Sequence, residues 1–161
     1  MLFKELLGQN KLKEFLMQSV REERVPHAQL FLGSKGSANL GLALAFAQYV
    51  ACTNKLEDDS CGNCPSCVKH QKFAHPDLHF VFPVATTASV KTKPVSKNFL
   101  VEWRALLNDN AYFSLFDWLK HIGVENKQGI ISVEESAHIV KDLSLSLIHI
   151  SEPTRRSGTS Y

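Results

Sequence analysis

The stretch GSKGSANLG, residues 33–41, joins two apolar segments and decides the fold that the sequence predicts. The apolar run 28–32 precedes it, and the run 40–51, rich in alanine and leucine, follows it. A strand, a glycine-rich turn and a helix in this order form the phosphate-binding P-loop. The stretch therefore predicts a strand over 28–32 and a tightly packed helix over 40–51.

The turn lacks the residues that a working P-loop requires. The motif is Gly, four free positions, then Gly-Lys-Ser/Thr. Counting from Gly33, the last three positions hold Ala38, Asn39 and Leu40. Asn39 has no charge to neutralise phosphate, and Leu40 has no oxygen to bind Mg²⁺. We therefore expect no ATP at this loop, and a plain packing turn remains the alternative reading.

Further segments alternate between helix and strand patterns. Residues 77–83 are typical of a buried strand that ends at a proline. Helices are predicted over 10–23, 98–108 and 112–120, and over about 133–143 after the capping box of Ser132 and Glu135. Alternating strands and helices favour an α/β domain, a parallel sheet flanked by helices.

The composition is that of an ordinary soluble domain. The chain has 161 residues, 44% of them hydrophobic and 21% charged, with a formal net charge of +2. This charge is too small to indicate a nucleic-acid or membrane surface by itself. The apolar runs are shorter than the roughly 20 residues that span a bilayer, and no signal-peptide pattern opens the chain. A cytoplasmic protein without membrane partners is expected.

The cysteines are confined to one short segment and predict a metal site. They have the spacing C-x8-C-x2-C-x2-C: Cys52, Cys61, Cys64 and Cys67. Zinc binds four thiolates in a tetrahedron, and Cys-x2-Cys lets one tight turn offer two of them. A site closed by four protein ligands has no position for substrate. We therefore expect structural Zn²⁺ in a cysteine module, residues 52–67.

Two other uses of the cysteines are disfavoured. Disulfides are rare in the reducing cytoplasm. An iron–sulfur cluster is conceivable from the spacing of Cys61, Cys64 and Cys67, but no Cys-Pro follows them and Cys52 lies upstream instead. His70 is surplus to a four-thiolate site and is interpreted as a surface residue or an outer neighbour of the metal.

Two groups of residues outside the module invite a functional interpretation. Lys91, Lys93 and Lys97 are read as part of a solvated loop, residues 84–97, rather than as a phosphate site. Asp77 and His79 fall on one face of the expected strand, but neither a nucleophile nor a third metal ligand accompanies them. The aromatic residues of the two central helices are expected to pack in the core.

The end of the sequence differs in kind from the rest. The stretch LSLIHISEPTR, residues 145–155, matches the translation of a common sequencing-library adapter. We interpret residues 145–161 as a non-native tail, with a disordered polar terminus as the alternative. Neither reading assigns the tail a function.

Several separate features together resemble one protein family. They are Gly8-Gln9, the stretch HAQLFLG at residues 27–33, the four cysteines, and His75-Pro76-Asp77. In this order they resemble bacterial clamp-loader subunits of DNA polymerase III. The resemblance implies a P-loop AAA+ type fold with a four-cysteine zinc module inserted after the first helix. Residues 1–144 would be the N-terminal part of that domain, and 84–129 an insertion.

The family contains two subunit types with this layout. The gamma and tau motor subunits keep an intact P-loop, whereas the delta-prime subunit often has a degenerate one. Ala38, Asn39 and Leu40 resemble the delta-prime type. The resemblance implies a non-catalytic subunit that joins gamma/tau and delta, and that meets the sliding clamp and primer–template DNA through the complex.

Two alternatives remain open from the sequence. One is an ATP-binding gamma/tau-like motor with an aberrant loop, which Asn39 and Leu40 disfavour. The other is a zinc-dependent nucleic-acid-binding module. Glu57, Asp58 and Asp59 disfavour it, because acidic residues in the cysteine module would repel phosphate.

Overall fold

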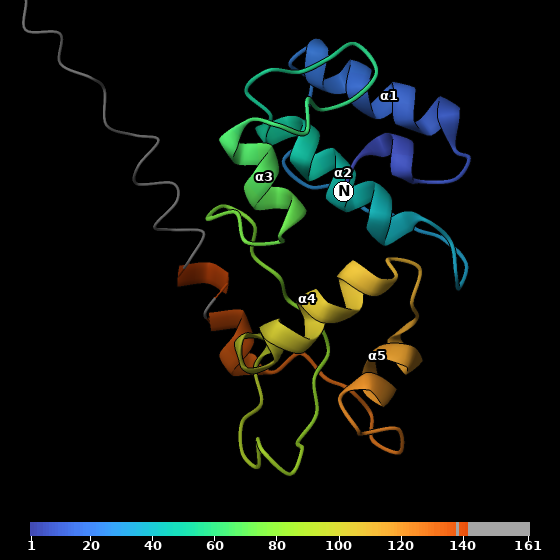
Figure 1. The fold of residues 1–161 in the computed structure, drawn as a ribbon. Helices are drawn as coiled ribbons and strands as arrows, with labels where there is room; N and C mark the ends of the chain where they lie inside the picture. The colour runs from blue at the N-terminus through green and yellow to red at the C-terminus, as the bar shows by residue number, and fades with distance from the viewer. Residues whose placement is uncertain (138, 142–161) are drawn as a thin grey trace, which may run out of the picture.

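The computed structural model of the chain describes residues 1–137 and 139–141, and its elements are helices joined by loops (Figure 1). In chain order they are the 3-10 helix η1 (Phe3–Glu5), α1 (Asn10–Arg21), α2 (Asn39–Ala51), α3 (Pro65–Gln71), the 3-10 helix η2 (Ser96–Phe99), α4 (Leu100–Asp109) and α5 (Leu115–His121). Residues 133–137 and 139–141 are also helical. Helices α1, α2 and α3 gather at one end of the molecule, and α4 and α5 at the other (Figure 1).

Helix α1 confirms the predicted helix over residues 10–23, although its apolar residues are unequally buried. Leu16 and Met17 are buried, whereas Phe15 is 65% exposed. Lys13 is buried beside them, and its Nζ donates a hydrogen bond of 2.6 Å to the carbonyl oxygen of Leu6. Because that bond satisfies the ammonium group, α1 packs with a lysine on its inner face.

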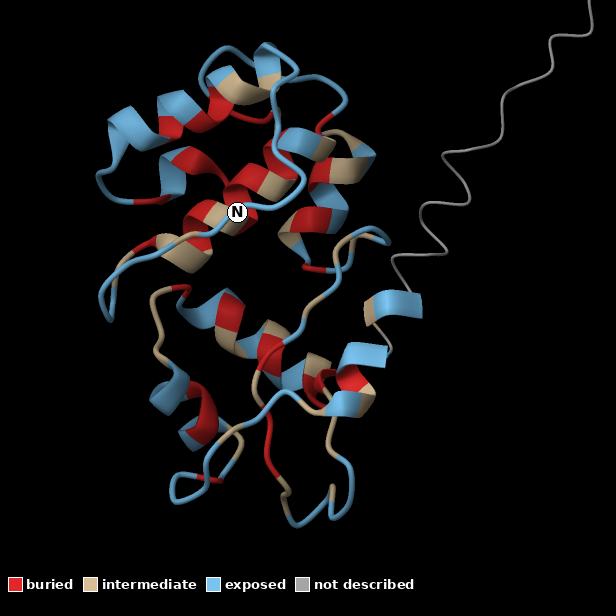
Figure 2. Cartoon of the chain, turned by 180° about the vertical axis from the view of Figure 1, so that it is seen from behind, coloured by how far each residue is buried: buried red, intermediate tan, exposed pale blue. Residues whose placement is uncertain are grey.

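Helix α2 is the central element of the first core. Seven of its thirteen residues are buried, as Figure 2 shows by the red segments along it. It contacts η1, α1 and α3, so its apolar surface is covered by other helices and not by the sheet that the sequence predicted. Gly41 allows this packing, because a Cβ there would lie 2.6 Å from Leu6 Cδ2.

The predicted α/β fold, an AAA+ type parallel sheet flanked by helices, is wrong for the described part of the chain. Neither 28–32 nor 77–83 forms a strand, and the described residues contain only one isolated antiparallel bridge, between Val84 and Ile130. Leu30 and Leu32 are 81% and 82% exposed. A strand needs a neighbour for its backbone N–H and C=O groups, and neither segment has one here.

In segment 77–83, the Ser96 side chain makes the hydrogen bonds to Phe82 that a neighbouring strand would otherwise make. Its hydroxyl accepts the backbone N–H of Phe82 at 3.0 Å and donates to the Phe82 carbonyl at 3.1 Å. Both backbone groups of Phe82 are thereby satisfied while its ring is buried. One side chain thus holds Phe82 in the core without a sheet.

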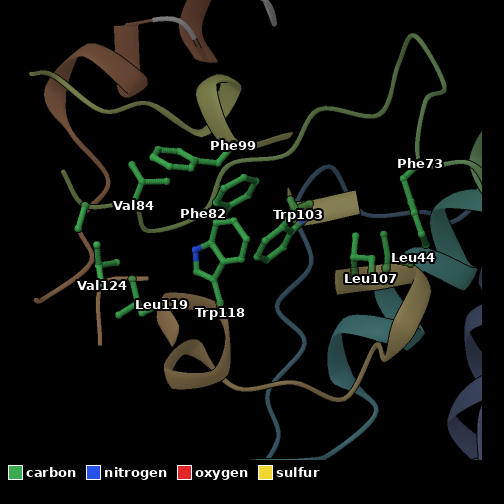
Figure 3. Close-up of a cluster of buried hydrophobic side chains, with 11 residues drawn as sticks. Leu44, Phe73, Phe82, Val84, Phe99, Trp103, Leu107, Trp118, Leu119 and Val124 are labelled. Carbon is green, nitrogen blue, oxygen red and sulfur yellow. The ribbon is translucent and has the colours of Figure 1, made fainter. Parts of the chain in front are cut away.

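A second core of aromatic rings lies between α4, α5 and the segment before η2 (Figure 3). The Phe82 and Trp103 rings stack with centroids 4.0 Å apart, and Trp118 meets both edge-on. The prediction that the tryptophans pack in the core is confirmed, but Phe116 is 55% exposed. Residues 84–129, predicted to be an insertion, supply most of this core; that they are an insertion stays a prediction.

The last described element confirms the predicted helix start after Ser132. The backbone N–H of Glu135 donates to Ser132 Oγ at 3.2 Å, as in a capping box. The Glu135 carboxylate instead accepts the backbone N–H of Ser96 at 2.6 Å. The predicted tail, residues 145–161, lies outside the described residues. Within the described part of the chain, no helix has both the length and the apolar character needed to cross a membrane.

Candidate metal centre

Four cysteines from α2, α3 and the loop between them converge on one point. Cys52 is the C-cap residue of α2, Cys64 is the N-cap residue of α3, Cys67 lies in the first turn of α3, and Cys61 lies in the loop. All four Sγ atoms lie within 4.8 Å of one another. The sequence-predicted ligand set is therefore assembled in space.

Two residues of the loop create the turn that the cluster needs. Gly62 has a left-handed φ of +75°, which glycine adopts without a steric cost. Pro65 occupies the first position of α3, where its fixed φ suits a helix and its missing N–H is not needed. The turn and the helix start bring Cys61, Cys64 and Cys67 to one side. Helix α3 was not predicted from the sequence, although the pairing of Cys64 with Pro65 is a local signal for its start.

Backbone N–H groups point at the sulfur atoms. The N–H groups of Cys61, Cys64 and Cys67 donate to the Sγ atoms of Cys52, Cys61 and Cys64 respectively, each at 3.4 Å. Hydrogen bonds to a charged group favour its charged form. The loop is therefore folded in a way that stabilises thiolates.

The thiols have opposite pKa shifts with clear causes. The backbone N–H of Cys67, followed by contacts from Thr53, lowers the pKa of Cys64 to about 5. Burial raises the pKa of Cys67 to about 12. At neutral pH these shifts favour the thiol form of Cys67, unless a cation takes the proton's place, and the thiolate form of Cys64.

The geometry of the four thiols fits a tetrahedral metal ion. Four sulfurs at 2.3 Å from one zinc ion would lie about 3.8 Å apart. The Sγ atoms of Cys52 and Cys61 are 3.6 Å apart, and those of Cys61 and Cys67 are 3.9 Å apart. None of the four is in a disulfide. The cluster can hold a soft metal ion with no coordination position left for substrate.

Asp59 ties this module to the start of the chain. Its Oδ1 accepts the backbone N–H of Phe3 at 3.2 Å, and its Oδ2 accepts that of Lys4 at 3.0 Å. The sequence pattern did not distinguish Asp59 from Glu57 and Asp58, because all three are consecutive acidic residues in a polar loop. Only the structure shows that Asp59 is buried and its two neighbours are exposed.

His70 is buried beside the module and does not lie on the surface. Its ring stacks on that of His75 with centroids 4.3 Å apart, and its Nε2 is buried without a hydrogen-bond partner. Burial, followed by the neighbouring His75, lowers the pKa of His70 to about 4. His70 is therefore neutral at physiological pH.

Ser66, His75 and Asp77 lie near one another but are not arranged as a nucleophilic triad. Ser66 Oγ is 3.1 Å from His75 Nε2. The backbone N–H of Asp77 donates a hydrogen bond to His75 Nδ1. In the neutral ring Nδ1 is therefore unprotonated, and the N–H group is at Nε2, where it donates a hydrogen bond to Ser66 Oγ. A general base must accept that hydroxyl proton, which this tautomer cannot do.

The glycine-rich turn is placed as predicted, at the start of α2, and lacks a P-loop lysine. Ala38 is the N-cap residue of α2 and makes no side-chain cap, and Asn39 Oδ1 accepts a hydrogen bond of 3.4 Å from Ser37 Oγ. Gly33 is needed for close approach, because a side chain there would clash with Ser37. Leu40 packs against the aromatic core.

A cleft of about 650 Å³ lies beside this turn, between it, α1 and residues 24–32. Its lining is mostly apolar, and its one cationic side chain, Arg24, is 3.4 Å from the Glu22 carboxylate. Lys35, the cation of the turn, is exposed and does not line the cleft. The cleft therefore has no lysine ammonium group, and its hydroxyls come from Ser19, Ser34 and Ser37 and not from the Ser/Thr position of a P-loop, which Leu40 occupies.

Comparison with protein families gives one match that covers most of the chain. Residues 8–152 match the family described as DNA polymerase III, delta subunit. No solved structure matches the chain significantly.

The similar curated proteins include DNA polymerase III subunits delta' and gamma/tau and plant STICHEL-like proteins. The chain is 36% identical over 77 residues to DNA polymerase III subunit delta' of Bacillus subtilis, an alignment covering 47% of this chain and 22% of the relative. It is 22% identical over 144 residues to DNA polymerase III subunit gamma/tau of Mycoplasma genitalium, covering 89% of this chain and 22% of the relative. It is 30% identical over 82 residues to Protein STICHEL-like 3 of Arabidopsis thaliana, an alignment covering 51% of this chain and 8% of the relative. The chain thus spans less than a quarter of the length of these relatives.

Proposed function

Since the chain belongs to the DNA polymerase III delta-subunit family, we propose that it is a non-catalytic, delta-prime-like subunit of the clamp loader. In this role it joins the gamma/tau and delta subunits in the cytoplasm. It helps to place the sliding clamp on primer–template DNA, which it meets through the complex. The protein would act by shape and contact, and the motor subunits would supply ATP hydrolysis.

The single observation that carries this proposal is the turn at residues 33–41. The family's motor subunits need a lysine and a hydroxyl at the first positions of the following helix. Here α2 begins with Asn39, and Leu40 packs into the core. ATP is accordingly not a cofactor of this chain, although the helix start retains a weak attraction for anions.

We further propose that Cys52, Cys61, Cys64 and Cys67 bind structural Zn²⁺. The 3.6 and 3.9 Å separations between their sulfurs support this, as do the backbone N–H groups aimed at the thiolates. When bound, the ion supplies a covalent-like crosslink between the end of α2 and the start of α3. The module then serves as a rigid protein-contact surface.

A gamma/tau-like motor is the second candidate, and one observation favours it. The alignment with the gamma/tau relative of Mycoplasma genitalium covers 89% of the chain. The absence of a lysine from the lining of the cleft argues against it. A zinc-dependent nucleic-acid-binding module is disfavoured, because the exposed Glu57 and Asp58 would repel phosphate.

Assembly with motor subunits tests the proposed function. The 161-residue chain, loaded with zinc, is mixed with bacterial tau and delta subunits and analysed by size-exclusion chromatography. We expect a stable complex that contains all three polypeptides without added ATP. A full-length delta-prime subunit is the positive control. If that control assembles while this chain elutes alone, the proposal is contradicted.

A further inference from the structure

The start of the chain is fastened to the cysteine module by one buried carboxylate. Asp59 is only 5% exposed, and its two oxygens accept three backbone N–H groups. Those of Phe3 and Lys4 come from residues 56 and 55 positions earlier, and that of Ser60, at 2.7 Å, comes from the module itself. We call residues 2–6 the N-terminal strap.

The strap and the module share the same surface of α2. Phe3 is buried and meets the Tyr49 ring edge-on with centroids 6.0 Å apart. The Tyr49 hydroxyl donates to the carbonyl of Leu56 in the module at 3.3 Å. Gln48 is also fully buried, and its Nε2 donates to Ser60 Oγ at 3.0 Å. The two segments therefore rest on adjacent residues of one helix.

On the Asp59 side of this junction, the cysteine cluster adds to three side-chain hydrogen bonds, from Tyr49 to Leu56, from Gln48 to Ser60 and from Arg21 to Glu57. Residues 53–58 are exposed, so burial contributes little to ordering them. Asp59 lies two residues before Cys61, and its neighbour Ser60 directly precedes that cysteine. Fixing Cys61 in a metal site therefore also fixes the position of the Asp59 carboxylate.

We propose that Asp59 is a positioning residue that couples metal binding in the cysteine module to the ordering of the N-terminal strap. This inference rests on the proposed metal site. When the metal binds, Asp59 is held where it can accept the Phe3 and Lys4 N–H groups. By reciprocity, a strap docked on Asp59 raises the affinity of the module for metal by the same factor.

The coupling predicts that a change at Asp59 weakens zinc binding although Asp59 touches no ligand atom. In Asp59→Asn an amide NH₂ replaces one oxygen and faces a backbone N–H donor, so one bond to the strap is lost. We expect zinc affinity to fall about tenfold, the lower end for loss of a residue that supports ligands. Asp58→Asn, the exposed neighbour, removes the same charge and should leave the affinity within twofold. Zinc affinity is measured in the full chain by competition with a chromophoric chelator.

Hydrogen exchange supplies a second readout, in the wild-type chain and in the variant. In the wild-type chain, removing zinc with a chelator should speed exchange at the Phe3 and Lys4 amides at least tenfold, as followed by NMR. The Leu107 amide in α4, remote from the module, should not change. In zinc-saturated Asp59→Asn the strap amides should exchange fast while those of Cys64 and Cys67 stay protected.

The outcomes separate this coupling from the metal site itself. If the wild-type chain binds zinc, but Asp59→Asn binds it equally well or the strap amides exchange alike with and without metal, the coupling is overturned and the metal site stands. If the wild-type chain binds no zinc, both are overturned.

Discussion

At the scale of single residues, Cys67 is the proposed ligand on which metal binding by the cysteine cluster would depend most. Its side chain is fully buried, and burial raises its pKa to about 12, so an uncompensated thiolate there would be costly. A metal ion removes that cost by replacing the proton. The Sγ atoms of Cys52, Cys61 and Cys64 each accept a hydrogen bond from a backbone N–H group.

Replacing Cys67 with serine should therefore abolish tight metal binding. We expect Cys67→Ser to lose more than the roughly 10- to 100-fold in zinc affinity that removal of an outer partner costs. The matched control is Ser66→Ala, the adjacent residue, whose hydroxyl contacts His75 and no cysteine. Competition with a chelator measures both variants. Unchanged affinity in Cys67→Ser would rule out the four-thiolate site.

The lowered pKa of His70 should make the stability of the folded chain depend on pH. Its pKa is about 4 in the folded chain against an ordinary value of 6.5, so between these values the unfolded chain binds more protons. Stability must then rise with pH across this window and fall on acidification. The groups that face His70 are His75, the amino terminus and Asp77, and burial outweighs them.

The variant His70→Phe keeps a flat ring against His75 and removes the titrating group. Urea unfolding at intervals from pH 4 to pH 7 should show a shallower slope of stability against pH in this variant than in the wild type. The difference between the two slopes isolates His70 from the other acid-sensitive groups. Identical slopes would contradict the assigned burial of a neutral histidine.

At the scale of elements, helix α5 has a complete capping box. Ser114 Oγ accepts the backbone N–H of Asp117, and the Asp117 carboxylate accepts the backbone N–H of Ser114 at 2.8 Å. That N–H is the main reason why the pKa of Asp117 is lowered. The box fixes where α5 starts and hence where Trp118 enters the aromatic core.

Removing the cap should destabilise the chain by a modest, measurable amount. Ser114→Ala is expected to cost about 1 kcal/mol in the free energy of unfolding, whereas Ser114→Gly should cost only a few tenths. Urea denaturation followed by tryptophan fluorescence measures both. An alanine variant as stable as the wild type would show that the Asp117 side of the box suffices.

Most of the described α-helices were predictable from the sequence because their signals are local, but α3 was missed. Apolar spacing located α1, α2, α4 and α5 to within a few residues, and the capping box located the helix after Ser132. The cysteine cluster was predictable because the spacing of its ligands is itself the signal. Asp59 was not, because its burial depends on a partner more than fifty residues away.

The strands were wrongly predicted because a strand is not a local structure. Apolar residues at 28–32 and 77–83 indicate that these segments suit a sheet, but pairing requires a second strand beside each of them. In the described residues Leu30 and Leu32 stay exposed, and Ser96 takes over the backbone groups of Phe82. The apolar pattern of the sequence shows neither the missing partner strand nor the hydrogen bonds from Ser96.

At the scale of the whole molecule, two cores are joined through α2. One is built around Phe46 and Tyr49 and supports the cysteine module, and the other is the aromatic cluster of Phe82, Trp103 and Trp118. Leu44 of α2 belongs to the second core, so the helix that follows the glycine-rich turn contacts both. The turn therefore lies at a structural junction, and this gives it a role in shape that does not require nucleotide.

Nucleotide binding tests the central claim, that this junction is structural and does not use ATP. The measurement is equilibrium binding of a fluorescent ATP analogue with Mg²⁺ to the purified chain, with a gamma/tau subunit as positive control. We expect no saturable binding in the micromolar range, and the same result for Asn39→Ala. Micromolar binding that Asn39→Ala abolishes would contradict the central claim and would favour the motor-like assignment.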